Sequence, residues 1–546
     1  MSSVCRLVAF LLLFVGGSHF ASAADDRPNL LFILTDDQRQ DTLGCTGNGL
    51  IQTPHLDRLA AEGTLLANAT VNSAICTPSR ACYFLGQYER RHGLNFNSGT
   101  ALSAEAWAGS YPVRLREAGY FTGYVGKNHV PVGPRGYKSG LMEDSFDAWY
   151  AGHGHLTFYP KERHKIFRAA AADTQTEVVS EGAERFLSAG DFLDGTQSFL
   201  DRRPQGQPFC LSIALNLPHG AGVRSMEMRP DDPELYRTAY RDRIDSFALP
   251  KTYTAKANIA SPKLPADVLY AQFRQDTYDF VDTPELLVEQ LIRKAQTITG
   301  IDRMVGRLRD LLAAEGLAEN TVIVFSSDHG IMNGEFGLGG KALNYEPCLR
   351  VPMIVMDPRL PPASRGRRSI ALAESVDIAP TLLDYAGVPI PARMQGQSLR
   401  PLIEGREESL RESSFAENLW STHFGNPRIE SVRTQDWKYI RYFATDRALF
   451  DDPDADDDGR QRYRVTREQV AAYASWLTAS IRGEQPSHEE LFHLASDPSE
   501  SVNLIDRAAY AAKRDELRAE CDRLVRMAKG DLEEPPATVP LERRGG

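Results

Sequence analysis

The sequence predicts an α/β protein, with a large, mostly parallel sheet flanked by helices and a smaller C-terminal α+β subdomain. Short apolar runs that end in polar residues recur along the N-terminal part of the chain, and helical stretches separate them. Runs of this kind are typical of central parallel strands, because helices cover both faces of such a sheet. The runs are NLLFILT at 29–35, FTGYVGK at 121–127, FCLSIAL at 209–215 and TVIVFSSD at 321–328.

The pattern changes near residue 395, which divides the chain into two predicted domains. In the first part, LDRLAAEG at 56–63 predicts an amphipathic helix between strands. In the second part, the alternation of WKYIRYF at 437–443 predicts an antiparallel strand, and the tail to about Lys529 predicts a packed helix. We therefore expect a large domain over residues 27–395 and a C-terminal subdomain over residues 396–546.

The first residues have the composition of a secretory signal peptide. Arg6 precedes an apolar run from Leu7 to Val15, and the small residues ASA follow at 21–23. The run is too short to span a bilayer, so cleavage after a signal of residues 1–24 is expected. No later segment has the apolar length of a membrane helix, which predicts an exported protein, periplasmic or secreted, without a transmembrane anchor in the mature chain.

The overall charge argues against a nucleic-acid partner. The formal net charge of the 546 residues is −11, and no basic stripe interrupts the sequence. Nucleic-acid binders normally carry a basic surplus on one face.

Polar side chains follow each of the four apolar runs. Asp36, Lys127, His219 and Asp328 all stand at or just past the end of a run. Ligands of open α/β sheets bind at the carboxyl ends of the strands, so these side chains are expected to meet at one edge. The adjacent Asp36 and Asp37 would repel each other there unless a cation lay between them, and a hard divalent ion is the usual solution.

The stretch CTPSRACYFLGQ at 76–87 carries the most specific signal. Cys76 with Pro78, Ser79 and Arg80 resembles the motif of the type I sulfatases, members of the alkaline phosphatase-like superfamily, although Leu85 replaces the usual small hydroxyl residue. The resemblance implies that Cys76 is oxidised to formylglycine by a formylglycine-generating or other sulfatase-maturating enzyme. A hydrated aldehyde suits sulfate transfer, because one hydroxyl attacks and the other then expels sulfate as the carbonyl re-forms.

The same resemblance implies a metal site. It assigns Asp36, Asp37, Asp328 and His329, with the formylglycine at position 76, to one divalent cation, generally calcium. His329 departs from the family pattern, in which an asparagine oxygen usually stands at this position. Calcium prefers oxygen ligands, so either His329 is a weak or outer ligand or the ion is not the family's usual calcium, which stays the first choice.

Further cations and histidines match the family's motifs in the same order along the chain. The resemblance extends over residues 27–400 and implies a sulfatase catalytic domain. It also implies that Arg80 orients the formylglycine hydroxyl. It implies that Lys127 and Lys341 hold sulfate oxygens, and that His129 and His219 transfer protons at the nucleophile and the leaving group. A charged transition state needs fixed positive groups of this kind in a dry pocket.

Two alternative functions remain open at this point. A phosphate mono- or diesterase of the same superfamily would share the paired aspartates but use serine or threonine as its nucleophile. A non-catalytic glycan-binding relative would have no reason to keep a nucleophile, and the intact site argues against it, namely Asp36, Asp37, Asp328, Lys127 and Lys341. The prediction is a sulfuric ester hydrolase, arylsulfatase-like, that acts on a sulfated small molecule or, most consistently with export, a sulfated polysaccharide.

Two predicted loops carry residue patterns that occur in ligand-binding loops. Residues 221–275 form an irregular insertion rich in Pro, Arg and Tyr, where loops commonly carry specificity. The insertion carries arginines that could contact an anionic substrate, namely Arg224, Arg229, Arg237, Arg241 and Arg243. The acidic stretch 451–460 contains half of a calcium-loop pattern, but Val465 stands where its glutamate should be, so a solvated loop is expected there.

Overall fold

The computed structural model describes residues 26–153, 190–219, 234–265, 268–269, 278–421, 427–449 and 465–542. The predicted signal peptide, the acidic stretch 451–460 and parts of the insertion at 221–275 lie outside the described residues.

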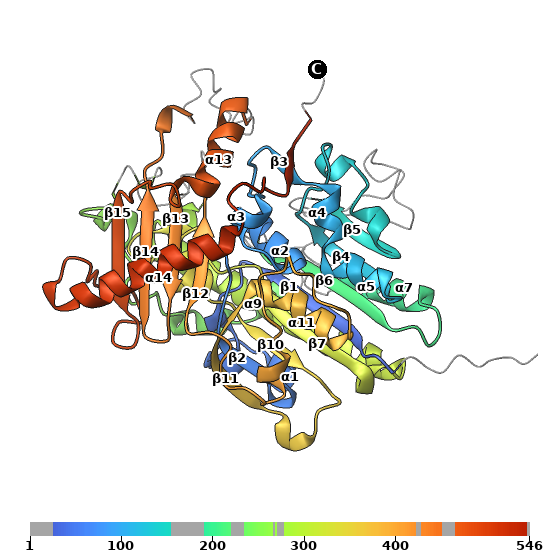
Figure 1. Ribbon diagram of the computed structural model, residues 1–546. Helices are drawn as coiled ribbons and strands as arrows, with labels where there is room; N and C mark the ends of the chain where they lie inside the picture. The colour runs from blue at the N-terminus through green and yellow to red at the C-terminus, as the bar shows by residue number, and fades with distance from the viewer. Residues whose placement is uncertain are drawn as a thin grey trace, which may run out of the picture.

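A large sheet runs through the centre of the molecule (Figure 1). Among the described residues, eight strands form it in the order β11-β2-β10-β7-β1-β6-β4-β5. Neighbours are parallel except β10, which runs antiparallel to both β2 and β7. The bounds in that spatial order are Arg367–Glu374, Thr64–Thr70, Met353–Met356, Thr321–Ser327, Asn29–Asp36, Phe209–Pro218, Phe121–Asn128 and Ala148–His153. This arrangement confirms the predicted mostly parallel sheet.

Strand β1 shows why its sequence is almost continuously apolar. Side chains alternate between the two faces of a strand, and both faces of β1 are covered. Its even-numbered residues Leu30, Phe32 and Leu34 join one hydrophobic core, and Leu31 and Ile33 join the other. The two cores therefore begin on opposite faces of the same strand.

Helices cover both faces of the sheet. Helices α1 (Pro54–Glu62), α7 (Gly190–Arg202) and α9 (Pro284–Ala314) pack on the face of Leu31 and Ile33. On the opposite face lie α2 (Cys76–Leu85), α5 (Tyr111–Glu117) and α11 (Ile378–Tyr385). In the described part of the chain, no helix combines the length and the apolar character needed to cross a membrane.

A small antiparallel sheet lies beside the large one (Figure 1). It has the order β12-β13-β14-β15, with bounds Ser414–Asn418, Arg428–Arg433, Trp437–Phe443 and His488–His493. Strand β14 is the predicted WKYIRYF strand, and the predicted tail helix is α14 (Ala511–Lys529), which packs on β13 and β14. Helix α13 (Arg467–Ala479) completes this part, which confirms an α+β subdomain.

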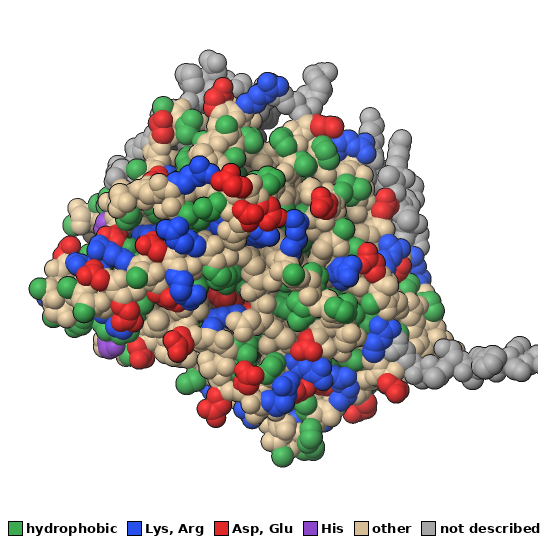
Figure 2. Space-filling view, viewed as in Figure 1, with side chains coloured by type: hydrophobic (Ala, Val, Ile, Leu, Met, Phe, Trp, Pro, Cys, Tyr) green, Lys and Arg blue, Asp and Glu red, His purple; other side chains and the backbone are tan. Residues whose placement is uncertain are grey.

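The shorter elements connect these layers. Strand β16 (Thr538–Pro540) pairs with β3 (Thr100–Leu102), so the end of the described chain returns to the large domain. Among the described residues, the remaining short α-helices and strands are α3 (Glu89–His92), α4 (Ala104–Ala108), α8 (Glu234–Thr238), α10 (Glu346–Leu349), α12 (Arg400–Ile403), β8 (Met332–Asn333) and β9 (Gly339–Gly340). On the face drawn in Figure 2, basic and acidic side chains are interspersed.

Candidate active site

Four neighbouring strands bring the predicted residues to one edge. Strands β7, β1, β6 and β4 are adjacent and parallel, so their carboxyl ends meet. Asp36 ends β1, Lys127 lies near the end of β4, and Asp328 and His219 directly follow β7 and β6. The predicted convergence of these side chains is confirmed.

A left-handed residue explains how two consecutive carboxylates serve one site. Successive side chains of an extended strand point to opposite faces. Asp37 instead has φ 60°, a conformation that aspartate tolerates better than most residues, and its N–H lies 3.3 Å from Asp328 Oδ1. This turn brings Asp37 back to the side occupied by Asp36.

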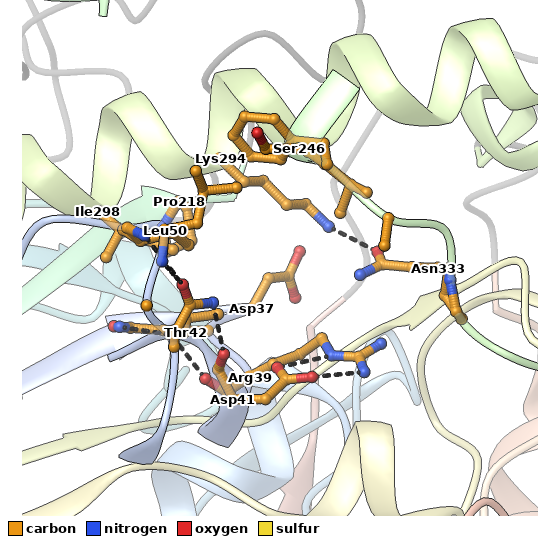
Figure 3. A pocket seen from close by; sticks show the side chains of 18 residues that line it. Asp37, Arg39, Asp41, Thr42, Leu50, Pro218, Ser246, Lys294, Ile298 and Asn333 are labelled. Atoms are coloured by element: carbon orange, nitrogen blue, oxygen red, sulfur yellow. Dashed lines mark hydrogen bonds and ion pairs between the residues drawn. The ribbon is translucent and has the colours of Figure 1, made fainter. Parts of the chain in front are cut away.

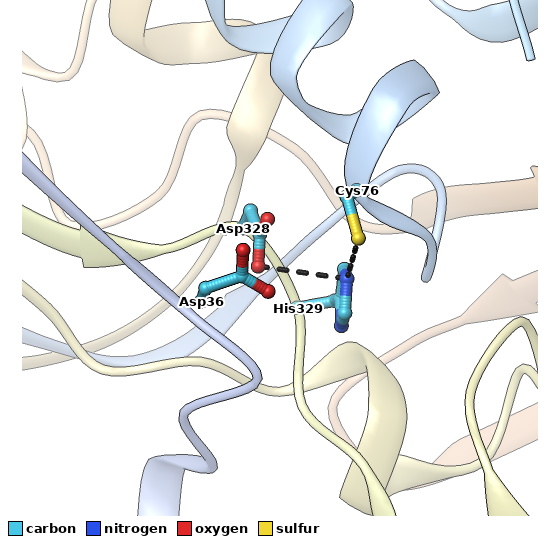
Figure 4. Close-up of side chains that lie close together, drawn as sticks. All are labelled: Asp36, Cys76, Asp328 and His329. Atoms are coloured by element: carbon cyan, nitrogen blue, oxygen red, sulfur yellow. Dashed lines mark hydrogen bonds and ion pairs between the residues drawn. The ribbon is translucent and has the colours of Figure 1, made fainter. Parts of the chain in front are cut away.

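Cys76 is the first residue of α2 and is buried, with 1% of its surface exposed. Its Sγ lies 3.2 Å from Lys341 Nζ. The same sulfur lies 3.5 Å from His329 Nε2 (Figure 4). The cysteine of the motif therefore faces two of the cationic or metal-ligating residues predicted from sequence.

Arg80 lies one turn after Cys76 and is fully buried. Its Nε donates to Asp328 Oδ2 at 3.0 Å, and its Nη2 donates to Asp36 Oδ2 at 3.1 Å and to the Leu215 carbonyl at 3.1 Å. A guanidinium supplies this fixed fork of donors, which an ammonium cannot. Arg80 thus joins the ends of β1, β6 and β7.

Ser79 fixes the same helix to the end of β7. Its hydroxyl donates to the Asp328 carbonyl, and its N–H donates to the Ile75 carbonyl at 3.1 Å. The sequence motif included Ser79 but gave it no role.

The carboxylates have the geometry of a cation site. Potential ligand atoms of Asp36, Cys76, Asp328 and His329 lie within 4.8 Å of one another, and those of Asp36, Asp37 and His219 do likewise. Among the described residues, Asp36 Oδ1 is buried without a hydrogen-bond partner. Three carboxylates and an unsatisfied carboxylate oxygen fit a hard divalent ion.

The two lysines of the prediction each contact one aspartate. Lys127 Nζ makes a short ion pair with Asp36 Oδ2, and Lys341 Nζ lies 2.9 Å from Asp37 Oδ1. Burial alone would raise the pKa of Asp36, but Lys127, His219 and Arg80 hold it well below its usual range. Asp36 is therefore an ionised carboxylate.

The three predicted histidines differ in their surroundings. Burial lowers the pKa of His219 to about 4, assisted by Lys341, and its Nε2 lies 3.8 Å from Asp37 Oδ2. His329 Nδ1 lies 3.2 Å from Asp37 Oδ1; burial lowers the pKa of His329, but Asp328 and Cys76 together raise it to about 9. The ring of His129 lies edge-on to Phe96, and burial with Lys127 holds its pKa well below the usual value.

A cavity of about 370 Å³ opens beside Asp37 of the carboxylate cluster (Figure 3). Asp37 lines it on one side, and Lys294 of α9 lies across it from Asp37. The sequence did not single out Lys294, because a lysine within a long amphipathic helix gives no signal of its own. Ser246, Phe247, Ala248 and Pro250 show that the insertion forms part of the wall.

The described arginines of the insertion lie elsewhere. Arg241 pairs with Glu289 at 2.9 Å through Nη2, Arg243 is exposed and Arg237 is exposed on α8. None of the three lines the cavity. Arg224 and Arg229 lie outside the described residues.

The chain matches two family models and is similar to several known proteins. A family model described as Sulfatase matches residues 28–388, and one described as N-sulphoglucosamine sulphohydrolase, C-terminal, matches residues 334–474. The chain is 27% identical to an N-acetylglucosamine-6-O-sulfatase of Bacteroides thetaiotaomicron, with 90% of this chain and 85% of that protein covered. It is 26% identical to an arylsulfatase of Clostridium perfringens, with 90% and 93% covered.

Solved structures share the fold. A protein solved in complex with its substrate D-glucosamine-2-N,6-O-disulfate has a TM-score of 0.66 at 24% identity, and covers 93% of this chain and 99% of its own. A phosphonate monoester hydrolase of Silicibacter pomeroyi has a TM-score of 0.68 at 21% identity, with 93% and 96% covered. Because the family model described as Sulfatase matches most of the chain, the protein belongs to the sulfatase family and is a sulfuric ester hydrolase.

Proposed function

We propose that this enzyme removes sulfate from a sulfated carbohydrate, using a formylglycine made from Cys76 and one bound divalent cation, with calcium as the first choice. The observation that carries the proposal is the position of Cys76. Its sulfur lies 3.2 Å from Lys341 Nζ, beside a cluster of carboxylates that includes Asp36 and Asp328. A structural cysteine has no need of such neighbours.

Position 76 and the cation would supply complementary chemistry. The hydrated aldehyde offers one hydroxyl for attack on sulfur and a second whose loss of a proton expels sulfate. Asp36, Asp37, Asp328 and His329 would hold the cation, which would supply polarisation of a sulfate oxygen and favour the ionised nucleophile.

The chain's own cations position the reacting groups. Lys341 Nζ, which contacts both Cys76 Sγ and Asp37, lies where it can bind a sulfate oxygen beside the nucleophile. Arg80 is engaged with Asp36 and Asp328, so we assign it to orienting the carboxylates as well as the hydroxyl of residue 76. Lys127, paired with Asp36, completes the positive surroundings of the sulfate.

The two histidines that are held neutral suit different steps. His219 keeps 20% of its side chain exposed, so we assign it to the leaving oxygen, which it stabilises by a hydrogen bond from its N–H while solvent water supplies the proton that this oxygen takes up. His129 is buried and held neutral, so it can accept the proton of the attacking hydroxyl.

The names of the relatives and the expected export support a carbohydrate substrate. One relative is named for N-acetylglucosamine 6-O-sulfate, and one structural neighbour binds a glucosamine disulfate. We propose a sulfated sugar as substrate, an exported periplasmic or secreted location, and a sulfatase-maturating enzyme as the partner that converts Cys76.

A second candidate is phosphonate or phosphate ester hydrolysis. It is favoured by the structural neighbour that hydrolyses phosphonate monoesters. Purified, matured enzyme should be offered an aryl sulfate, the matching aryl phosphate and an aryl phosphonate monoester. We expect the highest kcat/KM for the sulfate; a higher kcat/KM for either phosphorus ester would replace the proposal with the second candidate.

A further inference from the structure

The cavity beside Asp37 contains a buried cation without a matching anion. Lys294 extends from α9 with 8% of its surface exposed, and Nζ lies 3.1 Å from the neutral amide oxygen of Asn333 (Figure 3). Nζ also lies 5.2 Å from the centre of the Phe280 ring. Among the described residues, no carboxylate lies within ion-pair distance of Lys294.

The nearest carboxylates are engaged with other cations. Asp41 and Glu335 both pair with Arg39, at 2.9 and 2.6 Å, and Asp37 pairs with Lys341 at 2.9 Å. Burial lowers the pKa of Lys294 to about 8, although Asp37 acts in the opposite direction. A buried ammonium that is not paired costs stability, and an anion entering the cavity would offset that cost.

The rest of the lining suits a sugar ring. Leu50, Ile51, Phe247 and Leu291 give the cavity apolar walls, which can cover the C–H face of a pyranose. Gln38, Thr42 and Asn333 supply polar groups. The volume of about 370 Å³ lies in the range of small-molecule sites.

We propose that this cavity is a second anion subsite, in which Lys294 binds a sulfate or carboxylate group of the substrate other than the one being hydrolysed. The proposal rests on the sulfatase function above and specifies its substrate as a sugar with at least two anionic groups. Asp37 connects the two sites, because it contacts Lys341 beside Cys76 and also lines the cavity. The reacting sulfate would lie on the Cys76 side of Asp37 and the second anion on the Lys294 side.

The test compares sugars that differ in one anion. N-acetylglucosamine 6-sulfate carries one, glucosamine 2-N,6-O-disulfate carries two, and a monosulfated disaccharide that contains a uronic acid distinguishes a carboxylate from a sulfate. An aryl sulfate serves as the reference. We expect wild-type kcat/KM to be at least about ten-fold higher for a doubly charged sugar than for the singly charged one, with the difference mainly in KM.

Substitution of the lysine should remove that preference. In Lys294→Gln the ratio of the doubly to the singly charged sugar is expected to fall about ten-fold, and Lys294→Arg should restore much of it. The matched control is Lys256→Gln, because Lys256 is 52% exposed, pairs with Asp282 and does not line the cavity. This control should keep the wild-type ratio.

Separate outcomes distinguish the two proposals. If the wild type hydrolyses the aryl sulfate but shows no preference for either doubly charged sugar, the subsite is refuted and the sulfatase function stands. If a folded Lys294→Gln variant keeps the preference, the second anion binds elsewhere and the subsite is equally refuted. If the aryl sulfate is not hydrolysed at all, the proposed function itself fails.

A crystal structure tests the subsite even if the Lys294→Gln variant does not fold. In Cys76→Ala protein soaked with the disulfated sugar, the second sulfate should lie within hydrogen-bonding distance of Lys294 Nζ. Density for that sulfate outside the cavity would overturn the subsite.

Discussion

At the scale of single residues, two buried cysteines of one helix differ in their neighbours. Cys76 Sγ lies beside Lys341 and His329, whereas Cys82 Sγ lies 3.5 Å from His92 Nε2 near Glu89. Burial and Glu89 raise the pKa of Cys82 well above its usual value, so its thiol stays neutral. Position 76 alone of the two faces the carboxylate cluster.

We predict that Cys76→Ala lowers kcat by about 10⁴-fold or more, because it removes the nucleophile's precursor. The matched control is Cys82→Ala, which makes the same change in the same buried helix. It should keep kcat within a few-fold of wild type while it lowers Tm. Equal losses of kcat in the two folded variants would show that catalysis depends on the packing of α2 and not on the chemistry of residue 76.

The residue scale also shows what sequence could predict. Asp36, Cys76 and Asp328 were found because each belongs to a short local motif. Lys294 was missed because its role depends on a cavity formed by α9, the β1 loop and the insertion, which lie far apart in sequence.

At the scale of elements, helix α2 ends in a glycine whose conformation other residues rarely adopt. Gly86 has φ 60°, and its N–H donates to the Cys82 carbonyl at 2.9 Å. A Cβ at this position would meet the Val376 carbonyl and the Met394 side chain at 3.2 Å. Gly387, which follows α11, has φ 65° and no atom within 4 Å of such a Cβ.

These two glycines separate backbone strain from crowding. Gly387→Ala is expected to lower the free energy of unfolding by about 1 kcal/mol through the left-handed conformation alone. Gly86→Ala should cost about 1 kcal/mol more, because the added methyl also crowds its neighbours. Denaturant unfolding of both variants measures the difference, and equal losses would contradict the crowding.

The sequence predicts the parallel strands of the sheet but not the direction of every strand. The parallel strands were predictable because their apolar runs require cover on both faces. The direction of β10 was not, since a short apolar run reads alike in either direction and only the pairing with β2 and β7 fixes it.

At the scale of the whole molecule, buried ion pairs join the small sheet to the large domain. Glu430 of β13 accepts from Arg90 of α3 at 2.7 Å and from Arg441 of β14 at 2.6 Å. Burial raises the pKa of Glu430, but Arg90 and Arg441 together lower it to about 2. Pairings of this kind depend on the tertiary arrangement, which is why no sequence pattern predicted them.

This pairing predicts acid lability. Because the pKa of Glu430 is lower in the folded state than in the unfolded chain, its contribution is complete above about pH 4.5 and is lost as the pH falls toward 2. The contribution is about 3 kcal/mol. In Glu430→Gln, the deficit in unfolding free energy relative to wild type should therefore shrink between pH 4.5 and pH 2. A deficit that stays constant with pH would contradict the assignment.

The cation should stabilise the whole fold as well as serve catalysis. We predict that a chelator lowers both activity and Tm, and that calcium restores both in a concentration-dependent way. Stabilisation at 100 times Kd should be about 2.7 kcal/mol. A Tm that does not respond to any divalent ion would refute the cation site, independently of the activity measurement.

The central claim is tested most directly by the mass of the peptide that spans position 76. In enzyme from a host with the maturation machinery, the account predicts a peptide lighter than the encoded one by roughly the mass of a water, since the thiol becomes an aldehyde. Across preparations, the converted fraction should rise in proportion to the specific activity on an aryl sulfate. Fully active enzyme that contains only unmodified Cys76 would contradict the claim.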